Sequence, residues 1–201
     1  EEMLKLLELD RYGLELITPR TNYCVFGTPG AAPFIGYSDN LEMAEHVMND
    51  HGPDAVQSLA GLVQYLQVFK AVMDRNLLKP PEPVEAMIAG APDAQTREIL
   101  ATLFHGSAIE VIRKFFPDPD RHCHITGSLT ASAIDGTHMG PYTPGSALSL
   151  AYHYTAGDEY DFKIPRGGIG AISEALVKAL ERYAGEVQYK TQVKRVLVED
   201  G

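Results

Sequence analysis

Three glycines near the C-terminal end are the residues whose type and spacing could serve chemistry. Gly167, Gly168 and Gly170 lie in the run from Arg166 to Ala171, directly before an amphipathic stretch. Glycine lets the backbone pass close to a ligand, and the N–H groups at the start of a helix suit an electron-rich or anionic partner. The simpler alternative is a tight turn that only begins a helix. From these residues alone, the simpler alternative is favoured.

A predicted helix follows the glycines and fixes their position. Apolar residues recur every three or four positions over 172–183, which places them on one helical face, and Gly185 is predicted to be the left-handed residue that ends the helix. The segments 186–189 and 192–198 are rich in β-branched and aromatic residues, so we expect two strands. Residues 199–201 then predict a turn with no returning strand after it. The sequence therefore looks like a piece of a longer protein.

The same C-terminal segment resembles the central part of the phytoene dehydrogenase-like FAD-dependent oxidoreductases, in the flavin amine oxidase superfamily. The resemblance is carried by KIPRGGIGAISEAL at 163–176, a helix, and then TQVKRV at 191–196. Weaker matches are PYTPGS at 141–146 and YGLEL at 12–16. The resemblance thus touches both ends of the chain, but only its C-terminal motifs are specific.

This resemblance implies roles for two groups of residues. In such enzymes the glycine loop lies where the flavin ring meets the substrate cavity, which makes these residues candidates for substrate binding: Gly167, Gly168, Ile169, Gly170 and Ala171. The valine that opens the strand after the helix contacts the adenine end of FAD through its backbone, and Val193 matches it. Ala171 stands where monoamine oxidases have glutamine, which argues against amine-oxidase specificity. The resemblance assigns no catalytic residue and no metal.

The remaining chain predicts a helix-rich α+β fold. Short strands are expected near 14–17, 23–26 and 34–37, and helices over 39–51, 54–75, 93–104, 107–116 and 143–155. Asp39 with Glu42 and Ser107 with Glu110 are predicted to cap two of these helices, and Pro92 is predicted at the first position of the helix that continues over 93–104. Strands and helices do not alternate, so no complete Rossmann unit is expected. We predict a substrate-binding region over 1–165, with a small and mostly antiparallel sheet. Residues 166–201 would be a glycine turn, helix and strand belonging to an FAD-binding domain.

Composition excludes several classes of partner. The 201 residues carry 17 Lys and Arg against 27 Asp and Glu, a formal charge of −10, so nucleic acid is a poor partner. No apolar run approaches the roughly 18 residues that a transmembrane helix needs. Cys24 and Cys123 lie far apart and outside any CxxC pair, which makes a reducing cytoplasm the expected location. Homo-oligomerisation stays open.

Other reactive side chains give weaker signals. His122, Cys123 and His124 invite a metal interpretation, but adjacent side chains diverge, and a structural role is favoured. Asp135, His138 and His153 would form a catalytic group only if the fold gathered them. Ser146 is not in a GxSxG elbow, so no hydrolase is predicted.

Aromatic residues gather before the glycines, where they would form either a flat apolar substrate slot or part of the core: Tyr142, Tyr152, Tyr154, Tyr160 and Phe162. We expect an FAD-dependent oxidoreductase of the dehydrogenase or desaturase type, which removes hydride from a small-molecule organic substrate, large apolar molecules included. The dinucleotide motif is missing from the chain, so the chain alone should bind FAD weakly and be inactive. The alternative is a non-catalytic helical binding module for a lipid or a protein partner.

Overall fold

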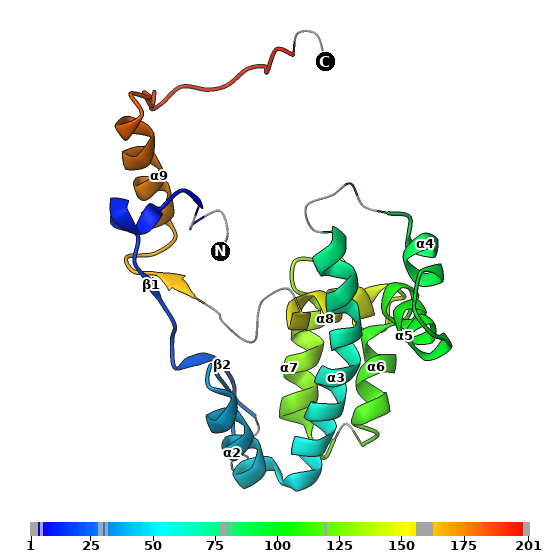
Figure 1. Cartoon of the computed structure of the whole chain (residues 1–201). Coiled ribbons are helices and arrows are strands. Elements are labelled where there is room, and N and C mark those ends of the chain that lie inside the picture. The colour runs from blue at the N-terminus through cyan, green and yellow to red at the C-terminus, as the bar shows by residue number, and fades with distance from the viewer. Residues whose placement is uncertain are drawn as a thin grey trace. The chain divides into compact units, whose positions relative to one another are not determined.

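Two compact units make up the chain (Figure 1). The computed structural model describes residues 4, 6–27, 30, 32–76, 80, 82–118, 120–155 and 163–198, and of residues 73–76 only the backbone. Residues 19–162 form one unit, here called the helical unit. Residues 1–18 together with 163–201 form the other, here called the terminal unit. The functional division into 1–165 and 166–201 stays a prediction.

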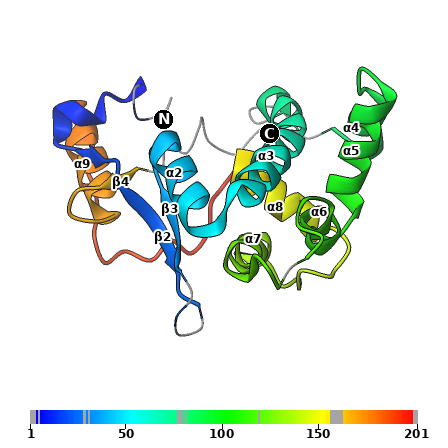
Figure 2. The same cartoon turned by 90° about the horizontal axis from the view of Figure 1, so that it is seen from below.

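The helical unit combines one β-hairpin with a set of packed helices, so the predicted helix-rich α+β class is confirmed. The hairpin strands are antiparallel, with Val25 opposite Phe34, and Figure 2 shows them beside α2. The elements are β2 (Thr21–Val25), β3 (Phe34–Tyr37), α2 (Asn40–His51), α3 (Pro53–Asn76), α4 (Val84–Ala89), α5 (Ala94–His105), α6 (Ala108–Phe115), α7 (Cys123–Ile134) and α8 (Ser146–Thr155).

Side-chain caps set the starts of three of these helices. The Asp39 carboxylate accepts the Glu42 N–H at 2.8 Å, as the sequence predicts for α2. Ser107 begins α6 with a complete capping box. Asp93 accepts the Thr96 N–H at 2.7 Å and is itself the N-cap of α5. Pro92, predicted as the first helical residue, therefore lies before the cap.

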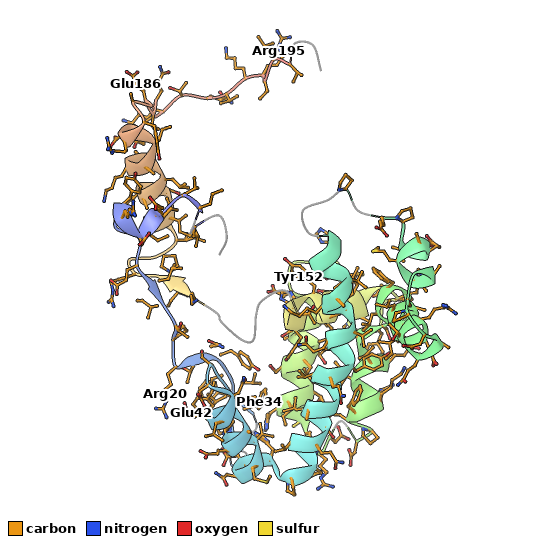
Figure 3. All side chains as sticks on the ribbon, in the orientation of Figure 1. Arg20, Phe34, Glu42, Tyr152, Glu186 and Arg195 are labelled. Atoms are coloured by element: carbon orange, nitrogen blue, oxygen red, sulfur yellow. The ribbon has the colours of Figure 1, made fainter. Side chains whose placement is uncertain are left out.

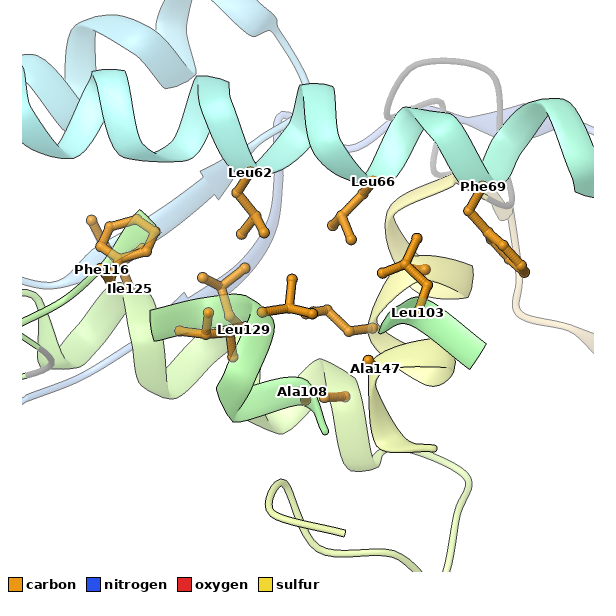
Figure 4. Packing of buried hydrophobic residues seen from close by; sticks show 14 of the residues in the cluster. Leu62, Leu66, Phe69, Leu103, Ala108, Phe116, Ile125, Leu129 and Ala147 are labelled. Atoms are coloured by element: carbon orange, nitrogen blue, oxygen red, sulfur yellow. The ribbon is translucent and has the colours of Figure 1, made fainter. Parts of the chain in front are cut away.

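The core of the helical unit forms where α3 faces the shorter helices. Leu62 and Leu66 of α3 are completely buried, and Figure 4 shows them directed at Leu103 of α5 and Leu129 of α7. Ala147 lies near the start of α8 and is completely buried. Small residues at such positions let helix backbones approach closely, so α8 fits among α3, α5, α6 and α7.

Helix α7 was not predicted, because its sequence is rich in serine, threonine and glycine. Such residues compete with the helix by bonding the backbone locally. In α7 their hydroxyls instead donate to carbonyls one turn back, as from Thr130 Oγ1 to the Thr126 carbonyl at 2.6 Å and from Ser132 Oγ to the Ser128 carbonyl at 3.1 Å. Burial of Ile125 and its neighbours then overrides the weak propensity. Helix α4, which begins directly after Pro83, was not predicted either.

The terminal unit joins the two ends of the chain around a small core. Strand β1 (Leu16–Ile17) pairs antiparallel with β4 (Ile164–Pro165). The 3₁₀ helix η1 (Leu9–Tyr12) packs on α9 (Gly170–Arg182). The buried residues of this core are Leu9, Leu14, Ala175 and Ala179.

Two predictions about the C-terminal segment were wrong. Residues 186–189 and 192–198 form no strand in the part of the chain that the structure describes, because a strand requires a partner for its N–H and C=O groups. The left-handed residue after α9 is Ala184, at φ +56°, and not Gly185. A Cβ at Gly185 would lie 2.4 Å from the Leu180 side chain, which would then have to move. The predicted turn at 199–201 lies outside the described residues.

Candidate functional site

The glycine turn joins β4 to α9, and two of its residues require glycine. Gly167 and Gly168 have φ values of +86° and +95°, in the left-handed region that side chains disfavour. The Gly168 N–H donates to the Pro165 carbonyl at 2.9 Å, and the Ala171 N–H donates to the Gly168 carbonyl at 3.1 Å. Gly170 has an ordinary φ and is the first residue of the helix.

Space around the turn is open. A Cβ added at Gly167, Gly168 or Gly170 would meet no described atom within 4 Å, and the Ile169 side chain is 82% exposed. Close packing against another described part of the chain therefore does not explain why these residues are glycines. Their backbone is accessible, as a loop that meets a ligand must be. Ala171 is half-buried and packs against the small core of the terminal unit.

The start of the chain holds this turn in place. The Arg166 N–H donates to the Glu15 carbonyl at 2.8 Å, and Arg166 Nε lies 2.6 Å from Glu15 Oε2. The hydrogen bond with Glu15 raises the pKa of Arg166. Both side chains are more than half exposed, so the backbone bond and the β1–β4 pairing do most of the positioning.

Val193 lies away from the turn, beyond the far end of α9. Its side chain is 75% exposed, in a segment without regular secondary structure. Helix α9, which separates the turn from this segment, has 13 residues and spans about 20 Å. The contact between Val193 and the adenine end of FAD stays a prediction.

A separate pocket of about 530 Å³ lies in the helical unit, between α3, the α7–α8 connection and α8. Phe69, Met139, Leu148 and Tyr152 supply apolar surface (Figure 3 labels Tyr152). This volume falls in the usual range for small-molecule sites. The sequence did not reveal the pocket, because its residues come from segments about 70 positions apart, and only the aromatic cluster pointed to one wall.

Asp135 and His153 both line this pocket. The sequence alone had left open whether the fold gathers them. His138 is exposed. Tyr142 is also exposed and lies under the Arg113 guanidinium, at 5.8 Å from the ring centre. Tyr154 packs against the core of the helical unit. Tyr160 and Phe162 lie outside the described residues.

The two histidines that invited a metal interpretation, and Ser146, have structural contacts. His122 is buried and its Nε2 lies 3.0 Å from Asp54 Oδ2, an interaction that lowers the pKa of Asp54. His124 lies against the Cα of Gly27. Ser146 is fully buried and accepts the Ala108 N–H at 2.8 Å. These side chains join elements of the helical unit.

Comparisons with known proteins give one informative match. No protein-family profile matches the chain, and no solved structure matches it significantly. The chain is 29% identical over 143 residues to a protein of Daucus carota named prolycopene isomerase, chloroplastic. The match covers 67% of this chain and 21% of that protein, so the chain spans about a fifth of its relative's length. The resemblance is to an enzyme, at the level of a distant homologue.

Proposed function

We propose that the chain is part of an FAD-dependent oxidoreductase of the dehydrogenase, desaturase or isomerase type, acting on an apolar organic substrate. The relative is by name an isomerase of prolycopene, which supports an enzyme of this type. The helical unit would bind substrate, and the terminal unit would contact the flavin. Removal of hydride is the finer part of the proposal and rests on the resemblance to phytoene dehydrogenase-like enzymes.

The observation that carries this proposal is the open glycine turn. Two successive left-handed glycines precede an amphipathic helix. The space beside them is open, so no described neighbour would clash with a side chain there. A turn that served only to start a helix would need neither the second left-handed residue nor the open space. Glycines with open space beside them let the main chain approach a planar ring closely.

Each part of the chain would contribute positioning rather than acid–base chemistry. FAD, when bound, supplies the group that accepts hydride. The backbone of residues 167–171 would lie at the edge between flavin and substrate, and Ala171 would leave room there by its small size. Val193 would bind the adenine end. The pocket side chains Phe69 and Tyr152 would bind part of the substrate's hydrocarbon and keep water away from it.

A second candidate function is a non-catalytic helical module that binds a lipid or a protein partner. The pocket favours it, since its lining needs no cofactor to bind an apolar molecule. The structure describes no helix long and apolar enough to cross a bilayer. The cytoplasmic location and the oligomeric state stay predictions, and the relative is named chloroplastic.

The test is the flavin content of the full-length gene product that contains these 201 residues. We expect about one FAD per polypeptide, released on denaturation and identified by its fluorescence. The 201-residue chain alone should bind added FAD weakly, because the main dinucleotide motif is missing from it. A full-length protein without flavin would support the binding module instead, and tight binding by the chain alone would contradict the proposed division of roles.

A further inference from the structure

Two histidines of α2 each have a ring nitrogen that the fold keeps unprotonated. His46 Nε2 accepts the backbone N–H of Ile35 in β3 at 2.9 Å. Its Nδ1 lies 2.8 Å from Asp50 Oδ2 and therefore carries the proton of the neutral ring. The His46 side chain is only 7% exposed. The hairpin thus depends on an imidazole acceptor for one of its backbone amides.

His51 has the same requirement for a different reason. The Pro33 carbonyl favours a proton on its ring, while its Nε2 is buried without a hydrogen-bond partner in the described part of the chain. The proton of the neutral ring therefore belongs on Nδ1. Two other rings enclose His51, with centroids 5.7 Å away at Phe34 and 5.6 Å away at His46.

We propose that His46 and His51 form an acid-sensitive latch, which holds the β2–β3 hairpin on α2 while both rings are neutral and releases it when they are protonated. A proton on His46 Nε2 would face the Ile35 N–H, donor against donor. A proton on His51 Nε2 would be buried among rings without an acceptor. Each event replaces a favourable or neutral contact by an unsatisfied donor.

The charged groups around the pair reinforce the effect. Burial is the main cause that lowers the pKa of His51, and His46 adds to it. His124 of α7 acts in the same direction, while Asp50 opposes it. Tyr37 of β3 covers the other side of His46, with ring centroids 5.5 Å apart. A positive charge on His46 or His124 therefore adds to the cost of protonating His51 in the folded unit.

The direction of the pH effect follows from the lowered pKa of His51. The unfolded segment takes up the proton more readily than the folded one, so the latch is stable above the ordinary histidine pKa of about 6.5 and weakens as pH falls below it. Its release would expose Phe34, which is 1% exposed when the hairpin is in place (Figure 3). The pair between Arg20 and Glu42 also joins the hairpin to α2, and it contains no histidine. We therefore expect local opening rather than complete loss of the unit.

Amide hydrogen exchange of the 201-residue chain tests the latch. Between about pH 7.5 and about pH 5.5, exchange corrected for its intrinsic pH dependence should become several-fold faster in peptides covering β3 and α2. Peptides from α6 should not change, since no histidine lies in that helix. Equal protection of β3 at both pH values would overturn the proposal.

Variants assign the effect to the two rings. The double variant His46→Gln, His51→Phe keeps an acceptor for Ile35 and an aromatic ring beside Phe34, and it should lose the acid response. His105→Gln removes an exposed histidine at the end of α5 and should keep it. If the double variant does not fold, the imidazole titration of the unmodified chain decides, with His51 titrating below the ordinary histidine value of about 6.5. A full acid response in the folded double variant, or a His51 midpoint at or above that ordinary value, would contradict the latch.

Discussion

The helical unit and the terminal unit use their apolar residues very differently. The helical unit buries leucines from several helices completely, among them Leu62, Leu66 and Leu103. The terminal unit has a core of four buried residues, while Leu176 on α9 and Tyr183 directly after α9 are 41% and 83% exposed. The first unit has enough buried surface to hold its own fold. The second presents backbone and apolar side chains, which is typical of a surface that meets something else.

The largest expected effect is the loss of a buried leucine from the helical unit. Leu66→Ala should lower the free energy of unfolding by about 3–5 kcal/mol, because it leaves a cavity between fully packed helices. The same change at Leu176, on exposed α9, should cost about 1 kcal/mol or less. Urea denaturation of both variants measures the difference. Equal losses would mean that the two units are packed alike.

A buried hydrogen bond of the helical unit should come next. Ser146→Ala leaves the Ala108 N–H without its acceptor at the start of α6, a change expected to cost about 1–3 kcal/mol. Ser149→Ala, one turn on in α8 and only half-buried, is the matched control. Thermal denaturation followed by circular dichroism would separate them. A Ser146 variant as stable as the control would show that the serine does not join α6 to α8.

The smallest effect belongs to the ion pair of the terminal unit. Arg166→Gln removes the contact with Glu15, but both side chains are largely exposed and the backbone hydrogen bond remains. We expect a slight fall in the melting temperature at low salt that disappears at high salt. Arg195→Gln, in the exposed C-terminal segment, serves as the control. A large fall that persists at high salt would show that the pair, and not the strand pairing, holds the glycine turn.

Sequence reasoning succeeded where structure depends on neighbouring residues. The caps at Asp39 and Ser107 were predictable, because a capping side chain bonds a backbone N–H three positions away. Helix α7 was not, because distant burial outweighs its weak local propensity. The segment 192–198 has the composition of a strand and forms none in the described structure, since composition cannot supply a partner.

The candidate site shows the same boundary. The glycine turn could be located from spacing alone, and the structure adds that Gly167 and Gly168 are left-handed while Gly170 is not. The pocket could not be located from the sequence, because Phe69 and Tyr152 line the same pocket only when α3 packs against α8. The substrate and cofactor roles of residues 167–171 and Val193 stay proposals.

One matched substitution tests the central claim, that the main chain of the glycine turn meets a flavin. Gly168 and Gly30 have nearly the same φ, +95° and +91°, and both have open space where a Cβ would point. Valine at either position should therefore bring similar backbone strain. In the full-length gene product we measure bound flavin and its absorption spectrum. The account predicts that Gly168→Val loses flavin or changes its spectrum while Gly30→Val does neither, and identical flavin content and spectra in the two variants would contradict it.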